Sequence, residues 1–360
     1  MKIRNSILLF SLAMGITPVF AQGISAPYQP GITQDAVSYW LPKTQLTVQV
    51  KVQKQIFKPG EFSRYAERYL RLSDVRDKAE EVWTITDVTI SASGVPDKDK
   101  LYTLAFPVKG KRPYVELTKD GILQSVNVQV KEAPSQPAPV AGKEKEKRVN
   151  PQDFMTEEIL MAGSTAKMAE LTAKEIYNIR ESRNAITRGQ ADFIPTDGES
   201  LKFMLESLSA QEAALLTLFN GTSETQEETF TINVTPDEAI NKQILFRFSS
   251  KLGVLPVNNL AGEPVWIDIT DRKMTDGCYA EQQTKAQSGK SKKVIPFLYY
   301  RIPGRAVVRI YNNRTQFLEQ DMQIAQFGKV EVVSTTIMGK NADTRITFDT
   351  TTGNVLGINE

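Results

Sequence analysis

Residues 46–52 read Leu-Thr-Val-Gln-Val-Lys-Val, a strict alternation of apolar and polar side chains. Successive side chains of a β-strand point to opposite faces, so this segment buries one face and exposes the other. One-sided burial of this kind is typical of antiparallel sheets, and the sequence therefore predicts a mainly antiparallel β protein. Further segments with strand character are residues 84–91, 101–108, 115–117, 123–130, 230–234, 244–248, 265–269, 306–311, 322–327, 330–336 and 345–349.

Two parts of the chain carry a helical period instead. Residues 60–72 repeat apolar side chains at i, i+3, i+4, i+7 and i+8, which predicts one short helix. Residues 151–221 predict two or three amphipathic helices, whose apolar stripes we interpret as core. Within them Asp197 is a predicted N-cap, Ser209 begins a capping box that restarts the helix, and Gly221 ends it.

The chain divides into five segments on this basis. Residues 1–21 are a predicted signal peptide, 22–132 an N-terminal β domain with one short helix, and 133–150 a Pro-rich and then charged linker or loop. Residues 151–221 form the helical segment and 222–360 a C-terminal β-sandwich domain. The predicted fold class is α+β, with two mainly antiparallel, sandwich-like β domains and a central segment of amphipathic helices. Because only a short polar run joins the helices to the next strand, we expect them to pack onto the C-terminal sandwich.

The first 21 residues indicate export. Lys2 and Arg4 precede an apolar run, and Val19 and Ala21 place small side chains at the −3 and −1 positions of a cleavage site. The run is about a dozen residues long, whereas a helix needs roughly 20 residues to cross a bilayer. We therefore expect cleavage after Ala21, no transmembrane segment in the mature chain, and a periplasmic or cell-surface-associated location.

The chain contains no histidine. Because histidine is the side chain that most often serves as a general base or a zinc ligand, its absence excludes Ser-His-Asp and Cys-His nucleophile activation and histidine-containing zinc sites. These exclusions favour a non-enzymatic protein. The alternative is a carboxylate-dependent, glycosidase-like hydrolase, which needs two facing Asp or Glu side chains roughly 5 to 9.5 Å apart. The sequence nominates no catalytic residue, no cofactor and no metal site.

The cysteine content and the net charge limit which disulfides and which binding partners are possible. Cys278 is the only cysteine, which excludes a disulfide within the chain. The chain has 44 basic and 42 acidic residues, and the predicted signal peptide removes two basic residues and no acidic one. The balanced mature chain has no overall field that would attract nucleic acid. We expect an envelope protein or a glycan as the partner, and the oligomeric state is left open.

Trp40, Trp83 and Trp266 are the candidate ligand-binding aromatic residues, because such rings stack on sugars and anchor protein interfaces. An exposed tryptophan beside tyrosines would indicate a glycan platform, whereas three buried tryptophans would leave protein binding or assembly. Arg301, within Tyr-Arg-Ile-Pro, is the fourth candidate, and we expect its guanidinium to lie over an aromatic ring or to meet a carboxylate.

The helical segment also carries a charged cluster of Arg180, Glu181 and Arg183. We interpret this cluster as a structural ion-pair network that holds the helix to the sandwich. A ligand clamp is the alternative.

Several stretches of the sequence, spread over nearly the whole mature chain, carry a family resemblance. They are residues 39–44 (YWLPKT), 57–70 (FKPGEFSRYAERYL), 162–169 (AGSTAKMA), 179–183 (IRESR), 197–201 (DGESL), 300–303 (YRIP) and 326–328 (QFG). On these motifs the chain resembles an uncharacterised family of exported Bacteroidales proteins, a domain of unknown function. The resemblance implies an exported protein of an anaerobic, gut-type Gram-negative bacterium, and it assigns no catalytic residue.

Overall fold

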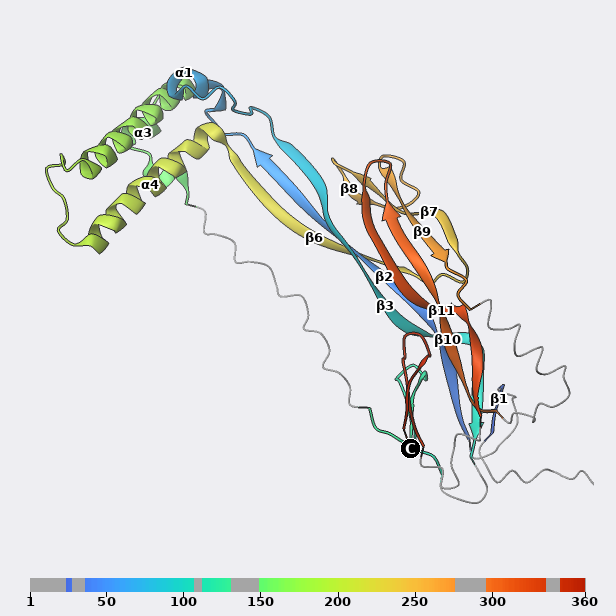
Figure 1. Cartoon of the computed structure of the whole chain (residues 1–360). Helices are drawn as coiled ribbons and strands as arrows, with labels where there is room; N and C mark the ends of the chain where they lie inside the picture. Colours follow the sequence, from blue (N-terminus) through green and yellow to red (C-terminus); the bar gives the residue numbers. More distant parts are fainter. Residues whose placement is uncertain are drawn as a thin grey trace, which may run out of the picture.

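The structure is a computed structural model that describes residues 24–27, 36–106, 112–130, 149–275, 296–334 and 344–359. These residues form three antiparallel sheets and a group of helices at one end of an elongated molecule (Figure 1). The predicted class, α+β with mainly antiparallel strands, is confirmed. The predicted signal peptide, most of the predicted linker and Cys278 lie outside the described residues.

The first sheet contains the two longest strands of the described chain. Its order is β1 (Ile24–Pro27), β3 (Glu80–Ala105), β2 (Ala36–Lys58) and β6 (Thr222–Val234). The predicted strands at 84–91 and 101–108 are both parts of β3. The residues between them are rich in Ser, Gly, Pro, Asp and Lys, which are weak strand formers. Pairing with β2 keeps this stretch extended, with one register shift between Trp40 and Pro42.

The second sheet covers the central part of the first. Its order is β11 (Gln316–Ser334), β10 (Pro296–Tyr311), β9 (Glu263–Asp271), β7 (Ile240–Ser249) and β8 (Gly253–Leu255). The alternating apolar residues of 46–52 are fully buried between the two sheets, as their period predicts. The buried core here comprises Leu46, Val48, Val50, Val52, Val88, Leu245, Phe246, Val265, Ile267, Ile269, Ala306, Val308, Ile310 and Ile324.

The third sheet is small and closes the end of the molecule that lies away from the helices. Its order is β13 (Val355–Asn359), β12 (Arg345–Phe348), β5 (Leu123–Val126) and β4 (Val115–Leu117). Leu123, Val126, Ile346 and Phe348 form one buried cluster with Tyr39 and Leu41 of β2. Gly353 turns the chain between β12 and β13 at φ +77°, a backbone conformation that suits glycine.

Strands from the two predicted β domains are mixed in these sheets. β6, from 222–360, pairs with β2 over thirteen residues, from Leu46↔Val234 to Lys58↔Thr222. β12 pairs with β5 in the same way, at Ile346↔Val126 and Thr347↔Ser125. The segments 22–132 and 222–360 therefore do not form separate sheets. A period of two shows which face of a strand is buried, but it does not show which strand lies beside it.

Six helical elements form what we call the helical tip. They are η1 (Ser63–Tyr65), α1 (Ala66–Leu70), η2 (Pro151–Phe154), α2 (Glu157–Leu160), α3 (Thr165–Thr187) and α4 (Gly198–Asn220). Figure 1 shows the tip at the far end of β2, β3 and β6, which extend beyond the second sheet as a three-stranded arm. Among the described residues, no helix has both the length and the apolar character needed to cross a membrane.

The expectation that the helices pack onto the C-terminal sandwich is wrong. Their core is formed with the short helical stretch near residue 66, so that Phe62, Ala66 and Leu70 contact residues of α3 and α4. The physical reason is that Thr222, directly after the C-cap Gly221, already belongs to β6 and pairs with Lys58 at the tip end of β2. The chain therefore leaves α4 along the arm and not toward the second sheet.

Candidate interaction site at the helical tip

The two long helices of the tip are packed along only part of their length. The buried residues of α4 are Glu212, Ala214, Leu215 and Phe219, all in its C-terminal part, while those of α3 end at Ile179. Residues 198–211 of α4 contain no buried position. The helical core therefore fills the end of the hairpin beside the arm and leaves the outer end, where α3 turns into α4, without one (Figure 1).

A buried ion pair marks the end of this core. The Nε atom of Arg180 and the Nη1 atom of Arg183 each donate to one carboxylate oxygen of Glu212, both at 2.6 Å. Glu212 is 8% exposed, whereas about a third of each arginine side chain is exposed. The predicted network is present, but it joins α3 to α4 and does not hold a helix to the sandwich; Glu181 is exposed to solvent.

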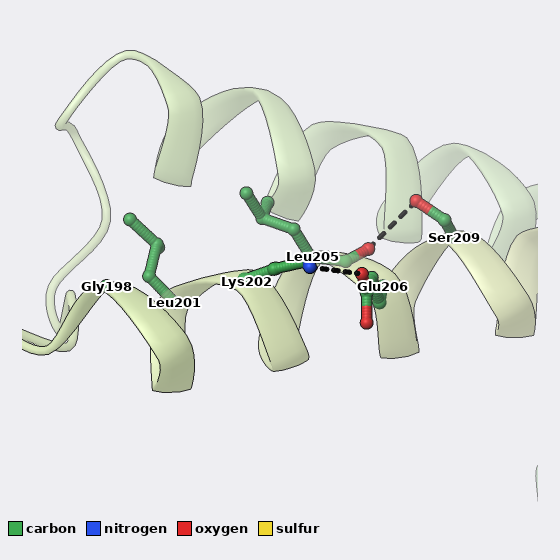
Figure 2. Close-up of a pocket in the computed structure, with 6 residues that line it drawn as sticks. All are labelled: Gly198, Leu201, Lys202, Leu205, Glu206 and Ser209. Atoms are coloured by element: carbon green, nitrogen blue, oxygen red, sulfur yellow. Dashed lines mark hydrogen bonds and ion pairs between the residues drawn. The ribbon is translucent and has the colours of Figure 1, made fainter.

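A shallow groove lies beyond this ion pair, along the outer half of α4. It encloses about 460 Å³ and is lined by Gly198, Leu201, Lys202, Leu205, Glu206 and Ser209. Figure 2 shows Leu201 and Leu205 pointing from α4 toward α3, with both side chains only half-buried. The Nζ atom of Lys202 lies 3.8 Å from a carboxylate oxygen of Glu206 on the rim. An apolar floor and a charged rim are thus open to solvent.

Large apolar side chains are also exposed around the groove. Phe193, in the loop between α3 and α4, is 72% exposed, and Phe203 of α4 is 74% exposed. Leu160 and Met161, which are 55% and 76% exposed, precede α3 at the end of the hairpin beside the arm and therefore lie away from the groove. At 3.6 residues per turn, Phe203 lies on the opposite side of α4 from Leu201. Phe193 and Phe203 therefore add exposed apolar surface at the outer end of the hairpin, although Phe203 does not line the groove itself. Exposed apolar surface of this kind marks a candidate interaction site.

Sequence reasoning missed these residues because it interpreted the stripe containing Leu201 and Leu205 as core. Asp197 does cap α4, since its carboxylate accepts from the backbone N–H of Ser200 at 2.9 Å. The helix is continuous through Ser209, whose hydroxyl donates to the carbonyl of Leu205 instead of restarting a helix. The available signal was Phe203, a large apolar residue that lies off the stripe.

The three candidate tryptophans lie apart, and each is half-buried. Trp40 of β2 donates its backbone N–H to the carbonyl of Gly121 at 2.9 Å. Trp83 of β3 packs against Gly253, and its backbone N–H donates to Ser250 at 2.8 Å. The Trp40 ring also lies against Gly121, so each of these two tryptophans contacts a neighbouring turn through both its backbone and its ring.

Trp266 of β9 has the aromatic neighbour that a glycan platform requires. Its ring centroid is 5.8 Å from that of Tyr311 on β10, with the planes tilted by 38°. The Nζ atom of Lys242 lies 5.1 Å from the Trp266 ring, a cation–π geometry. Since Trp266 is half-buried and already contacts two side chains, the glycan platform stays a prediction.

Arg301 meets a carboxylate, one of the two expected environments. It is 5% exposed on β10, and its Nη2 atom donates to Asp97 of β3, which is 3% exposed. Nη1 donates to the carbonyl of Ala325 at 3.3 Å, while Nε has no hydrogen-bond partner among the described residues. Burial lowers the pKa of Arg301, and the nearby Asp97 opposes this shift. The guanidinium thus joins the first two sheets in the interior.

A second pocket gathers carboxylates near the arm, as the hydrolase alternative requires. It is lined by Arg76, Asp77, Lys78, Ala79, Glu80, Glu81 and Lys251. Arg76 and Lys251 approach Glu80 to 3.6 and 3.3 Å, and Lys54 approaches Glu81 to 2.9 Å. Glu80 and Glu81 thus both take part in ion pairs, and the hydrolase alternative stays a prediction. Within the described ranges, no group of three or more acidic or cysteine side chains is arranged to hold a metal ion.

The sequence profile of one family, Domain of unknown function (DUF4831), matches residues 35–356. The chain belongs to this family. The DUF4831 match runs from β2 to β13, so it includes all three sheets and the helical tip. It confirms the resemblance to an uncharacterised family, while the bacterial group and export stay predictions. Comparison with curated proteins and with solved structures found no match.

Proposed function

We propose that this DUF4831 protein is a non-enzymatic, exported cell-envelope protein that binds a protein partner through the helical tip. One observation carries the proposal: residues 198–211 of α4 contain no buried position, the leucines that line the groove are only half-buried, and Phe193 and Phe203 are exposed. Apolar surface that stays exposed to water costs solvation free energy, and this cost is removed when another surface covers it.

The composition of the tip favours a protein partner over a glycan. Leu201, Leu205, Phe193 and Phe203 offer aliphatic and aromatic contacts, whereas sugars need several polar groups placed to bond hydroxyls. Helical grooves with apolar floors are a common way of binding an amphipathic helix. The arm places this surface at the end of the molecule, away from the second and third sheets (Figure 1).

Site-specific photo-crosslinking in the native host tests the proposal. A photoreactive phenylalanine analogue at Phe193 or Phe203 is expected to give a defined protein adduct, and Leu205→Asp is expected to abolish it. The control position is Thr270, an exposed residue on β9 of the second sheet. Adducts from Thr270 together with none from the tip would contradict the proposal. Export is tested separately by N-terminal sequencing, with Gln22 expected as the first residue and a retained Met1 as the contrary result.

A further inference from the structure

We infer that the partner seated on the groove of α4 is a second copy of this chain, so that two copies pair tip to tip about a twofold axis. The inference rests on the proposed function and names the partner of the same surface. It commits to one geometry, in which the outer halves of the two α4 helices lie antiparallel.

The first supporting observation is that the two charged residues on the rim of the groove can pair with the same two residues of a second copy. Lys202 and Glu206 lie one helical turn apart on the same rim, and their side chains are 75% and 66% exposed. A twofold axis requires the same surface on both copies, so each charge has to meet its opposite when the surface is turned by 180°. With the axis level with Met204, Lys202 of each copy faces Glu206 of the other.

The second observation is the apolar floor beside these charges. Leu201 and Leu205 of each copy lie in the groove and are half-buried in the single chain. Antiparallel pairing places the floor of one copy against the floor of the other and so buries part of residues 198–211, where the single chain has no buried position. The result is a four-helix arrangement of two hairpins, an established way of burying such stripes.

The position of the tip permits this pairing. Figure 1 shows that α3 and α4 extend beyond the end of the three-stranded arm, while the second and third sheets lie along the other part of the molecule. A second copy can therefore approach the outer half of α4 without meeting the sheets. A second copy that bound beside the second sheet would have less room to approach.

Analytical ultracentrifugation of the full mature chain with charge-swapped variants tests the inference. The unmodified chain is expected to dimerise. Lys202→Glu or Glu206→Lys alone places like charges opposite each other at two symmetric positions, and each is expected to weaken the dimer at least tenfold. The double variant restores opposite charges and is expected to return the dissociation constant to within about threefold of the original.

Two further variants separate dimerisation from folding. Leu205→Asp is expected to give a folded monomer, with the helical circular dichroism of the parent. Lys51→Glu changes an exposed ion pair with Asp87 on the first sheet and is expected to leave the dimer intact. Lysine and glutamate are both good helix formers, so each charge swap keeps the helix propensity of α4. A single swap places like charges one turn apart within α4, and circular dichroism checks that the helix remains intact.

Three outcomes would overturn the inference. They are a monomer at all concentrations, a dimer that neither single charge reversal weakens, and a dimer that the double variant fails to restore. If the chain is monomeric while Phe203 still crosslinks to another protein, the partner is a different chain and the proposed function stands. If the chain is monomeric and the tip gives no crosslink, both fail.

Discussion

Arg301 illustrates how a single charged residue stabilises the place where the three sheets meet. Its guanidinium donates to Asp97 of β3, and its backbone N–H donates to the carbonyl of Gly353 in the turn of the third sheet at 3.0 Å. Lys43 of β2 approaches the same Asp97 to 3.7 Å and donates to Asp237 at 2.8 Å. That hydrogen bond to Asp237 raises the pKa of Lys43. The cluster therefore connects strands that are far apart in the sequence.

Arg301→Met is expected to destabilise the protein by about 3–5 kcal/mol, because it leaves the buried Asp97 carboxylate without its closest cation. Chemical denaturation measures the loss. The matched control is Arg305→Met on the same strand, which breaks an exposed ion pair with Asp321 and is expected to cost less than about 1 kcal/mol. Equal losses in the two variants would contradict a special role for Arg301.

At the scale of the element, polar contacts hold the two helices of the α3–α4 hairpin together at the point where their apolar core ends. Its packed half relies on residues such as Ile176 and Phe219, and Glu212 joins the helices where that core ends. Asp197 begins α4 as an exposed N-cap. The Glu212 ion pair predicts the effect of a substitution on stability, and the Asp197 cap predicts a pH dependence.

Glu212→Gln is expected to cost about 1–3 kcal/mol, since the amide lacks the negative charge and keeps only one of the two oxygens that accept from Arg180 and Arg183. The partial exposure of the arginines keeps the loss below that of a fully buried pair. Glu170→Gln, in the exposed pair with Lys167 of α3, is the control and is expected to change stability by less than about 0.5 kcal/mol. A neutral Glu212→Gln would show that the ion pair does not hold the hairpin.

The Asp197 cap predicts a pH dependence confined to the start of α4. The hydrogen bonds from the backbone N–H and the hydroxyl of Ser200 lower the pKa of Asp197 below its usual 3.8. A lowered pKa means that the cap stabilises the helix above the unfolded pKa, and that this contribution is lost as pH falls through the folded pKa. An NMR titration of the Ser200 amide should follow this transition, and Asp197→Asn, which caps without titrating, should remove it. A midpoint above 3.8 would contradict the cap.

At the scale of the whole molecule, pairing between distant segments decides how the chain responds to cleavage. β6 pairs with β2 along its whole length, and β12 pairs with β5. The two parts of the chain on either side of 131–148 therefore contribute strands to two common sheets. Neither part retains all the neighbours of its own strands without the other.

A protease site inserted between residues 140 and 141 is expected to give two fragments that remain together. After cleavage they should co-elute in size-exclusion chromatography under native conditions and separate in denaturant, because the first and third sheets both contain strands from each fragment. Cleavage of an unmodified parent preparation under the same conditions is the control. Separation of two folded fragments without denaturant would contradict the shared sheets.

The sequence by itself determined the class of the fold, the buried face of several strands and the local boundaries of helices. Alternation in 46–52 predicted the buried face of β2, and Asp197 and Gly221 were identified as the ends of α4. These features depend on side-chain period and capping, which act over a few residues. Only the tertiary structure decided that β2 lies beside β6 and that half of α4 lacks a core. The reason is that an apolar stripe has the same sequence pattern whether another element or solvent covers it.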